Sequence, residues 1–286
     1  ANEQFLPGIK LSKCIMPEAS MMTAIENVQL VIIACSSPHV RMTMRHLEYC
    51  LDGRKVIVAH IAKGIEIKTN LTMHEVVQSE LPAPLRKSVV TISGPSIAKE
   101  LVAGVPTAVV AASQNKKAAE FVRDVFTSDT FRVATSADWK GVSMCGALKN
   151  IYAIALGMCD GMRLTMNAKA FMVTFAFHEM AQITRVLGGK PETVYGLAGL
   201  GDMIVTGFGN GRNRAIGERI CKEGHCKFVW EKSAPTHEGV AAAKVFYELT
   251  RRKKISAPLI KLVYRVLYQA ADPCAAVTQF FATVKL

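Results

Sequence analysis

Hydrophobic and polar positions change their pattern near the middle of this chain, and the first half alternates short apolar runs with helical stretches. The runs whose β-branched residues and length predict strands are Gln29 to Cys35, Lys55 to His60, Ser88 to Ile92, Ala108 to Ala112 and Phe131 to Val133. Several of them are apolar throughout, which is typical of parallel strands buried on both faces. The pattern predicts an α/β domain with a doubly wound, Rossmann-like sheet.

From Asp138 onward the apolar positions recur at helical spacing, in stripes of Met, Ala, Phe and Leu. A glycine-rich stretch between residues 196 and 211, with Pro235 and Pro258, interrupts these stripes. A chain of 286 residues, 50% of them hydrophobic, can bury two cores. We therefore expect a partial, Rossmann-like domain at residues 1–137 and an all-α domain at residues 138–286.

The net charge of +12 raises the question of nucleic-acid binding. The basic residues are dispersed, however, and an aromatic content of 7% offers few platforms for base stacking. The densest basic run, residues 251–254, follows a helix predicted from Ala241 to Thr250 and suits the negative end of its dipole. The charge instead predicts a field that collects a phosphorylated small molecule, with no nucleic-acid partner.

The apolar runs are all shorter than the roughly eighteen residues that span a bilayer, and the start of the chain lacks a basic region followed by an apolar one. Both observations predict a cytoplasmic protein without membrane insertion. The eight cysteines lack paired spacing, as is typical of free thiols in a reducing compartment. Cys221, His225 and Cys226 match no zinc pattern, so no metal site is expected.

The stretch from Gly196 to Arg214 carries the first candidate chemistry. Its six glycines between residues 196 and 211 disfavour an ordinary helix or strand, and Arg212-Asn213 follows them where an apolar-periodic helix begins. The N–H groups of a helix start and an adjacent guanidinium both favour a phosphate or carboxylate. A glycine-rich surface loop with a solvated arginine is the alternative interpretation.

Lys149 lies in a predicted helix that is apolar on almost every side, from Met144 to Leu156. A buried ammonium is costly, and it persists where it pairs with a carboxylate or transfers protons, because burial lowers its pKa. The alternative is a lysine with a buried stem and a head that reaches water.

Segments of one known family occur in order along nearly the whole chain. They are Leu6 to Leu11, Ala62 to Glu66, Ser93 to Glu100, Gly104 to Val110, Asp138 to Gly141, the helix around Lys149, Asp160-Gly161, Asn167 to Ala170, Gly196 to Asn213 and Glu238 to Val240. With these segments the chain resembles NAD(P)-dependent glycerol-3-phosphate dehydrogenase. The resemblance implies interconversion of sn-glycerol 3-phosphate and dihydroxyacetone phosphate, with NAD or NADP as cofactor. It also implies that residues 1–137 form a partial dinucleotide-binding domain and that residues 138–286 bind the substrate and carry out catalysis.

The resemblance also implies roles for single residues, since reducing a phosphorylated ketone requires a hydride, a proton and cations for the phosphate. Lys149 becomes the general acid/base, and the implied catalytic residues are Lys149, Lys63, Asp202 and Thr206. The implied substrate contacts are Lys63, Gly94, Ser96, Lys149, Asp202, Arg212 and Asn213. The implied cofactor contacts are Lys63, Ala98, Arg212 and Glu238. A carboxylate beside Lys149 opposes the lowering of the Lys149 pKa by desolvation, which is a physical reason for placing Asp202 there.

Simpler interpretations of single residues stay open at this point. Gly94-Pro95 is also a plain helix start, Glu238 a surface carboxylate, and Lys63 a cation at a strand end. Asn167 and Lys169 match the family without an assigned role. The family match favours the functional interpretation of the set as a whole.

The family opens with a strand, a G-x-G-x-x-G turn and a helix, whose glycines let the backbone approach the cofactor pyrophosphate. This sequence contains no such motif and begins with Ala1, so we expect an incomplete dinucleotide-binding domain that lacks the first β-α-β unit. In that case the segment near Cys14 to Met16 would lose its neighbour, the Gln29 to Cys35 strand would form an open edge, and cofactor affinity would be poor. The residue that selects NAD or NADP would lie on the missing unit.

One alternative to this interpretation is an enzyme of the same broad architecture, and a second comes from another class. A β-hydroxyacid dehydrogenase would carry Lys-x-x-x-Asn on the catalytic helix, whereas here Asn150 is adjacent to Lys149 and Ala153 occupies the fourth position. A non-catalytic scaffold that kept the helical domain is the other. A homodimer is expected for the complete protein. The ending Val284-Lys285-Leu286 weakly resembles a peroxisomal signal, an alternative to the cytoplasmic location.

Overall fold

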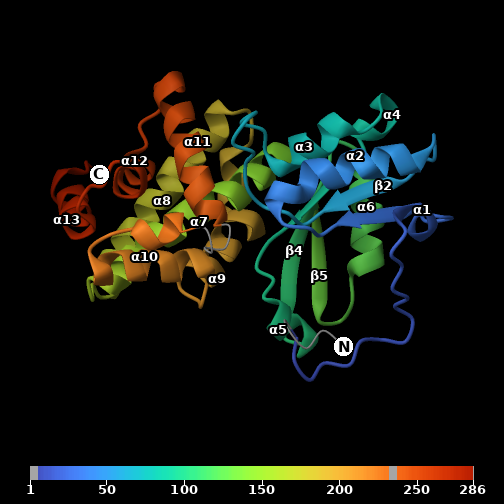
Figure 1. Ribbon diagram of the computed structural model, residues 1–286, viewed down its shortest axis with the longest axis horizontal. Coiled ribbons are helices and arrows are strands. Elements are labelled where there is room, and N and C mark those ends of the chain that lie inside the picture. Colours follow the sequence, from blue (N-terminus) through green and yellow to red (C-terminus); the bar gives the residue numbers. More distant parts are fainter. Residues whose placement is uncertain (1–5, 232–236, 286) are drawn as a thin grey trace.

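The computed structural model describes residues 6–231 and 237–285. Figure 1 shows two regions side by side, one built on a β-sheet and one built of helices. The last strand, β5 (Phe131–Ser136), ends just before the long helix α7 (Trp139–Gly161). Asp138 caps this helix, because its carboxylate accepts a hydrogen bond from the Gly141 N–H at 3.0 Å. The chain therefore passes from sheet to helices between residues 136 and 139.

Five strands form one sheet, and their order in space follows the chain. They are β1 (Leu30–Ile33), β2 (Ile57–His60), β3 (Val90–Ser93), β4 (Thr107–Ala112) and β5. The first three run parallel, with Leu30 opposite Ile57 and Ala59 opposite Val90. Each strand overlaps the apolar run that predicted it, so the five predicted strands are confirmed.

β4 departs from the parallel arrangement because it runs antiparallel to β3, with Ile92 opposite Ala111. The connection between these strands contains only the short helix α5 (Ala98–Val102). A parallel crossover usually needs a helix long enough to carry the chain back along the sheet. The longer α6 (Lys116–Phe126) does this between β4 and β5, which pair in parallel.

Helices cover both faces of the sheet, as two neighbouring residues of β2 show. Val58 packs in one core cluster with Met44 of α2 (Val40–Leu51) and Val77 of α3 (Met73–Glu80). Ala59 packs in another cluster with Val122 of α6. Because successive side chains of a strand point to opposite faces, the sheet is doubly wound, as predicted. Three short elements complete this region, namely α1 (Met21–Ala24), η1 (Ser37–His39) and α4 (Ala83–Arg86).

β1 lies at one edge of the sheet, and no described residue pairs with its free side. The segment near Cys14 to Met16, which was expected to lack its neighbouring strand, is not part of the sheet. That segment is exposed and forms a turn, in which the Ile15 N–H donates to the Ser12 carbonyl at 3.1 Å. A strand needs a neighbouring ladder for its backbone groups, and this segment satisfies one of them locally instead.

The second region consists of helices, as the periodicity predicted. Its elements after α7 are α8 (Met166–Val186), η2 (Pro191–Tyr195), η3 (Leu197–Gly201), α9 (Asp202–Gly207), α10 (Arg212–Glu223), η4 (Lys227–Trp230), α11 (Glu238–Lys253), α12 (Pro258–Tyr268) and α13 (Pro273–Thr283). The helix predicted from Ala241 to Thr250 lies within α11, which ends on the basic residues.

α7 forms the centre of the helical core, and every residue from Gly141 to Cys159 is buried. By length and composition this helix could cross a membrane, yet the segment that meets this test is wholly buried inside the protein. α10 lies against it with almost no space between the backbones. A Cβ at Gly157 would stand 1.9 Å from the Arg214 carbonyl oxygen, and one at Gly217 would stand 1.9 Å from that of Ile154. Only glycine permits this approach, which fixes the start of α10 relative to α7.

Candidate active site

Asp202 joins two lysines from different parts of the chain. Lys149 Nζ donates to Asp202 Oδ1 at 2.5 Å, and Lys63 Nζ donates to Asp202 Oδ2 at 2.6 Å. Lys149 Nζ also donates to Thr206 Oγ1 at 2.7 Å. The carboxylate thus balances two ammonium groups, one on each of its oxygens, in a residue that is only 2% exposed.

The four residues meet where the sheet region contacts the helical region. Lys149 comes from the middle of α7, whereas Lys63 lies on the loop that follows β2. Asp202 and Thr206 lie one turn apart on α9 and therefore share a face. The glycine-rich η3 brings Asp202 to this place as a π-helical turn, in which the Gly201 N–H donates to the Gly196 carbonyl at 3.2 Å. Single π turns are frequent at functional sites.

Burial makes Lys149 a weaker base than an ordinary lysine. The side chain sits deep in α7, and desolvation lowers its pKa to about 8. The positive charge of Lys63 lowers the pKa further, whereas Asp202 and Glu238 raise it. An amine with a pKa near neutrality exchanges protons readily at physiological pH.

The turn after β3 closes one side of the Lys63 ammonium group. The Gly94 carbonyl accepts hydrogen bonds from Lys63 Nζ and from Ser96 Oγ, each at 3.2 Å. Gly94 has a φ of +140°, and a Cβ there would stand 2.9 Å from the Val109 Cα. Glycine is therefore required for the turn that presents this carbonyl.

A chain of amide hydrogen bonds connects α7, α10 and α11. Asn213 Nδ2 donates to Asn150 Oδ1 at 3.0 Å, and Asn213 Oδ1 accepts from the Gly239 N–H at 3.2 Å. Asn150 Nδ2 in turn donates to Glu238 Oε2 at 3.3 Å. Burial raises the pKa of Glu238, while Arg212 and Lys149 oppose this effect by their charge. These hydrogen bonds fix the orientation of the Asn213 side chain near Lys149.

Three predicted residues are not bonded to Lys63, to Asp202 or to the amide chain in the part of the protein that the structure describes. Ser96 and Ala98 are exposed at the turn into α5, and Ser96 reaches only the Gly94 carbonyl. Arg212 is exposed at the first position of α10, where its charge acts on Glu238. An exposed cation at a helix start is free to meet an incoming anion.

A cleft of about 430 Å³ opens beside Lys63, between the two regions. It follows the carboxyl ends of the parallel strands β1 and β2, which is where open α/β sheets bind their ligands. Its walls are the start of α2 with η1, the loop after Lys63, and the start of α11. The lining includes Ser37, Pro38, Arg41, Gly64, Glu66, Glu238 and Ala241.

Two family models match the chain. The one described as the N-terminus of NAD-dependent glycerol-3-phosphate dehydrogenase matches residues 1–119, and the one described as its C-terminus matches residues 138–278. The NAD(P)+ glycerol-3-phosphate dehydrogenase of Anaeromyxobacter dehalogenans is 37% identical over 278 residues, which are 97% of this chain and 83% of that protein. The chain belongs to the NAD-dependent glycerol-3-phosphate dehydrogenase family.

Other similar proteins agree with this assignment. Glycerol-3-phosphate dehydrogenase of Bacillus velezensis is 35% identical over 285 residues, which are 99% of this chain and 82% of that protein. The crystal structure of glycerol-3-phosphate dehydrogenase from Coxiella burnetii aligns with a TM-score of 0.89 at 32% identity, over 98% of this chain and 85% of that one. These matches confirm the predicted dehydrogenase and its NAD or NADP cofactor, and nothing in them supports the non-catalytic alternative.

The cleft fits one end of the dinucleotide that this dehydrogenase family uses. Its volume and its place at the ends of β1 and β2 suit part of such a ligand. Lys63 and Glu238 flank it from opposite regions of the protein. When bound, NAD(P) supplies or accepts the hydride.

Asn150 is the site residue whose role the sequence did not predict. It bonds both Asn213 and Glu238, and so joins two groups that were predicted separately. Its position directly after Lys149 in a buried, apolar helix was the available signal. Lys169, left without a role, forms an ion pair with Asp160 at 2.6 Å, and Asp160 also pairs with Arg214 at 2.8 Å. Asn167 is exposed in the first turn of α8. Among the described residues, no group of His, Cys, Asp or Glu is arranged to hold a metal ion.

Proposed function

We propose that Lys149 is the general acid and base of glycerol-3-phosphate oxidation and dihydroxyacetone phosphate reduction. The observation that carries this proposal is its buried ammonium, bonded to Asp202 and Thr206 beside the cleft, with its pKa lowered to about 8. In reduction the ammonium gives a proton to the carbonyl oxygen as that oxygen gains charge. In oxidation the neutral amine takes the hydroxyl proton.

Lys63 and Asp202 assist this transfer in the proposed mechanism. Asp202 holds both ammonium groups, so Lys63 stands next to Lys149 without a bond between them. Lys63 adds positive charge where the oxyanion develops, which stabilises the transition state more than the ground state. Thr206 orients the Lys149 amine, and Gly94 with Ser96 contacts the substrate from the turn after β3.

Arg212 and Asn213 bind the phosphate group of the substrate in this proposal. They open α10, where N–H groups and the helix dipole favour an anion. Arg212 is exposed and can present a planar fork to two phosphate oxygens, while Asn213 is held by Asn150 and Gly239. The hydrogen bond from Asn213 to Asn150 connects the proposed phosphate site to Lys149, because Asn150 is the next residue on α7.

We infer that Lys63, Ala98, Arg212 and Glu238 contact the cofactor around the cleft. Lys63 and Glu238 are supported by their positions beside it or in its lining. Ala98 rests on family resemblance together with its exposure at the start of α5. Hydride transfer requires a site that excludes water and holds its groups in a fixed geometry. The buried ion pairs between Asp202 and its two lysines contribute to both.

We further propose a domain boundary between residues 137 and 138, a homodimer, and a cytoplasmic location. The boundary is supported by the end of β5 and by the Asp138 cap of α7. The bacterial relatives support the location, whereas the peroxisomal alternative has no support among them. Sedimentation equilibrium would test the dimer, since a monomer at micromolar concentration contradicts it.

Substrate discrimination tests the proposed function directly. The purified protein is assayed with NADH or NADPH and either dihydroxyacetone phosphate or unphosphorylated dihydroxyacetone. We expect kcat/KM to be at least about a hundredfold higher for the phosphorylated ketone, because a charged group paired with Arg212 contributes roughly 3 kcal/mol. Equal rates for both ketones would contradict the assignment of the phosphate site.

A further inference from the structure

The loop that carries Lys63 is held at both of its ends. It joins β2 to α3, and His60 Nδ1 donates to the Ala62 carbonyl at 3.2 Å at the end of the strand. At the other end the Thr72 N–H donates to the Glu75 carboxylate at 2.8 Å, as part of a capping box. Between these points the loop has no regular structure beyond an isolated bridge from Ile65 to Thr72.

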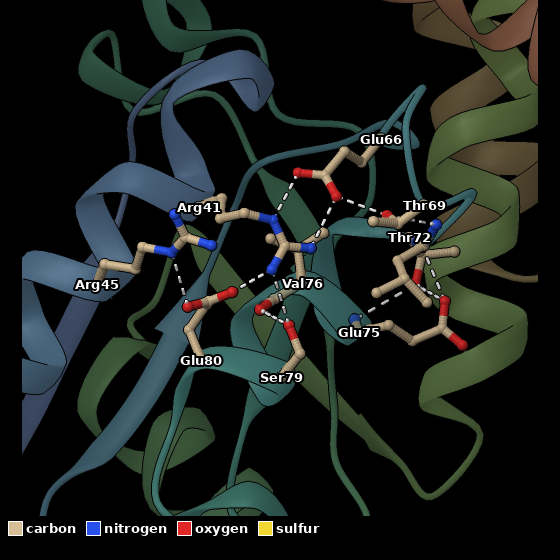
Figure 2. Close-up of polar contacts among 10 residues, drawn as sticks. Arg41, Arg45, Glu66, Thr69, Thr72, Glu75, Val76, Ser79 and Glu80 are labelled. Atoms are coloured by element: carbon tan, nitrogen blue, oxygen red, sulfur yellow. Dashed lines mark hydrogen bonds and ion pairs between the residues drawn. The ribbon is translucent and has the colours of Figure 1, made fainter.

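Arg41 forms an ion pair with Glu66 in the middle of this loop. Figure 2 shows the guanidinium of Arg41 facing the Glu66 carboxylate, with two parallel contacts. Arg41 Nε donates to Glu66 Oε1 at 2.8 Å, and Arg41 Nη2 donates to Glu66 Oε2 at 2.7 Å. Thr69 Oγ1 donates to the same carboxylate at 2.5 Å. A two-point contact of this kind fixes orientation as well as distance.

The opposite side of the same guanidinium contacts α3. Arg41 Nη1 pairs with the Glu80 carboxylate and lies 3.3 Å from Ser79 Oγ, while Arg45 Nε donates to Glu80 Oε2 at 3.2 Å. Figure 2 shows Arg41 between Glu66 and Glu80. Arg41 comes from α2, so one side chain ties together α2, α3 and the loop. These groups are partly exposed, and their contribution to global stability is therefore small.

We propose that Arg41 and Glu66 are positioning residues for Lys63. Glu66 lies three residues after Lys63, and its carboxylate ties the loop to α2 between the two fixed ends. Lys63 must reach Asp202 Oδ2 at 2.6 Å and the Gly94 carbonyl at 3.2 Å at once, which a loose loop does not guarantee. The proposal rests on the proposed function of Lys63 beside the reacting carbonyl.

Displacement of Lys63 has an electrostatic signature at Lys149. The charged groups that face Lys149 are Asp202 of α9, Glu238 of α11 and Lys63. Lys63 lowers the pKa of Lys149, whereas the two carboxylates raise it. A loop that no longer holds Lys63 in place therefore raises the pKa of Lys149 above about 8. A residue that merely stabilised the fold would not move this pKa.

The test compares Glu66→Gln with the matched control Glu80→Gln. Both variants remove a carboxylate partner of Arg41, but Glu80 lies on α3 and not on the loop. We expect Glu66→Gln to lower kcat about tenfold while KM for dihydroxyacetone phosphate changes less, because small misplacements of a catalytic group are costly. Glu80→Gln should leave kcat and the pH profile of the reaction unchanged.

A second readout does not depend on turnover. The pKa of Lys149 is followed by NMR in protein labelled with 13C at lysine Cε, and its resonance is assigned by its loss in Lys149→Met. We expect a higher pKa of Lys149 in Glu66→Gln and an unchanged one in Glu80→Gln. Arg41→Lys, which keeps the charge but loses the fork, should resemble Glu66→Gln and replaces it if that variant does not fold.

The outcomes separate the two proposals. If Glu66→Gln and Glu80→Gln give the same kcat and the same pKa of Lys149, the positioning role is wrong. If the unmodified protein does not reduce dihydroxyacetone phosphate, the proposed function is wrong, and the titration of Lys149 still decides whether Glu66 positions Lys63.

Discussion

Two buried carboxylates of the helical region are stabilised in different ways. Asp202, beside the cleft, is 2% exposed and bonds two ammonium groups. Glu179 of α8 is 4% exposed and accepts backbone N–H groups of Leu259 and Ile260, at 2.9 and 3.1 Å, in the first turn of α12. Burial raises the pKa of Glu179 to about 8. The difference between cations and amides as partners separates the proposed site for proton transfer from a helix cap.

The donors around the two carboxylates explain why we propose a chemical role for Asp202 alone. Around Asp202, the donors are the ammonium groups of Lys149 and Lys63, which carry protons that can transfer. Around Glu179, the donors are the backbone N–H groups of Leu259 and Ile260, whose protons do not transfer. The Tyr152 hydroxyl also lowers the pKa of Glu179. Glu179 satisfies N–H groups of α12 that lack intrahelical partners. Equal burial thus leads to different roles, depending on which donors surround the carboxylate.

Among the variants that test Asp202 and its partners, Lys149→Ala should have the largest effect. We expect Lys149→Ala to lower kcat by at least about a hundredfold while KM changes less, because proton transfer is lost in the transition state. Steady-state kinetics with dihydroxyacetone phosphate provides the measurement. Lys222→Ala is the control, since Lys222 pairs with Glu218 on the surface of α10. A kcat close to that of the unmodified protein in Lys149→Ala would rule out the assigned role.

Asp202→Asn tests whether the carboxylate sets the pKa of Lys149. Asp202 raises this pKa, so its removal should lower it below about 8. Reduction needs the ammonium form, and its rate should fall at a lower pH than in the unmodified protein. Oxidation needs the amine, and its rate should begin to rise at a lower pH.

Asp160→Asn is the matched control for that variant, because Asp160 also pairs with two cations, Lys169 and Arg214, but not with Lys149. The measurement is the pH dependence of kcat in both directions. An identical shift in Asp160→Asn and Asp202→Asn would show that the effect is not local.

Arg212→Lys examines the exposed cation near the same site. The charge is kept, but a lysine ammonium cannot reproduce the fork of a guanidinium on phosphate oxygens. We expect KM for dihydroxyacetone phosphate to rise about tenfold with a smaller change in kcat. An unchanged KM would contradict the proposed phosphate contact.

Glu179→Gln tests the other buried carboxylate and should have the smallest effect on catalysis. The folded-state pKa of about 8 lies above the ordinary value of 4.5, so the folded protein binds more protons than the unfolded chain between these pH values. The stability contributed by this group is present at low pH and is lost as pH rises through about 8. The slope is at most about 1.4 kcal/mol per pH unit.

Glutamine at position 179 does not titrate, so the stability difference between Glu179→Gln and the unmodified protein should shift in favour of the variant as pH rises. Urea unfolding between pH 5 and pH 8 measures this difference. A difference that stays constant across the range would contradict ionisation of a buried Glu179.

The sequence by itself determined the elements and the family. Short apolar runs and stripes of period 3.6 depend on which residues face a core, so they were sufficient for the five strands and for the helices after Asp138. Ordered family segments then identified the dehydrogenase, pointed to Lys63 and implied that Asp202 lies beside Lys149. The segment near Cys14 to Met16 forms no strand, because a strand depends on a neighbour that a local pattern does not contain.

Only the tertiary structure decided that Lys63 meets the same Asp202 carboxylate. Lys63 and Asp202 are far apart in the chain, and their contact depends on the packing of α7 against α9 and β3. The sequence also did not predict three further features. They are the antiparallel direction of β4, the role of Asn150 and the ion pair between Arg41 and Glu66. Each rests on contacts between distant segments, and the burial that lowers the pKa of Lys149 exists only once those segments have packed.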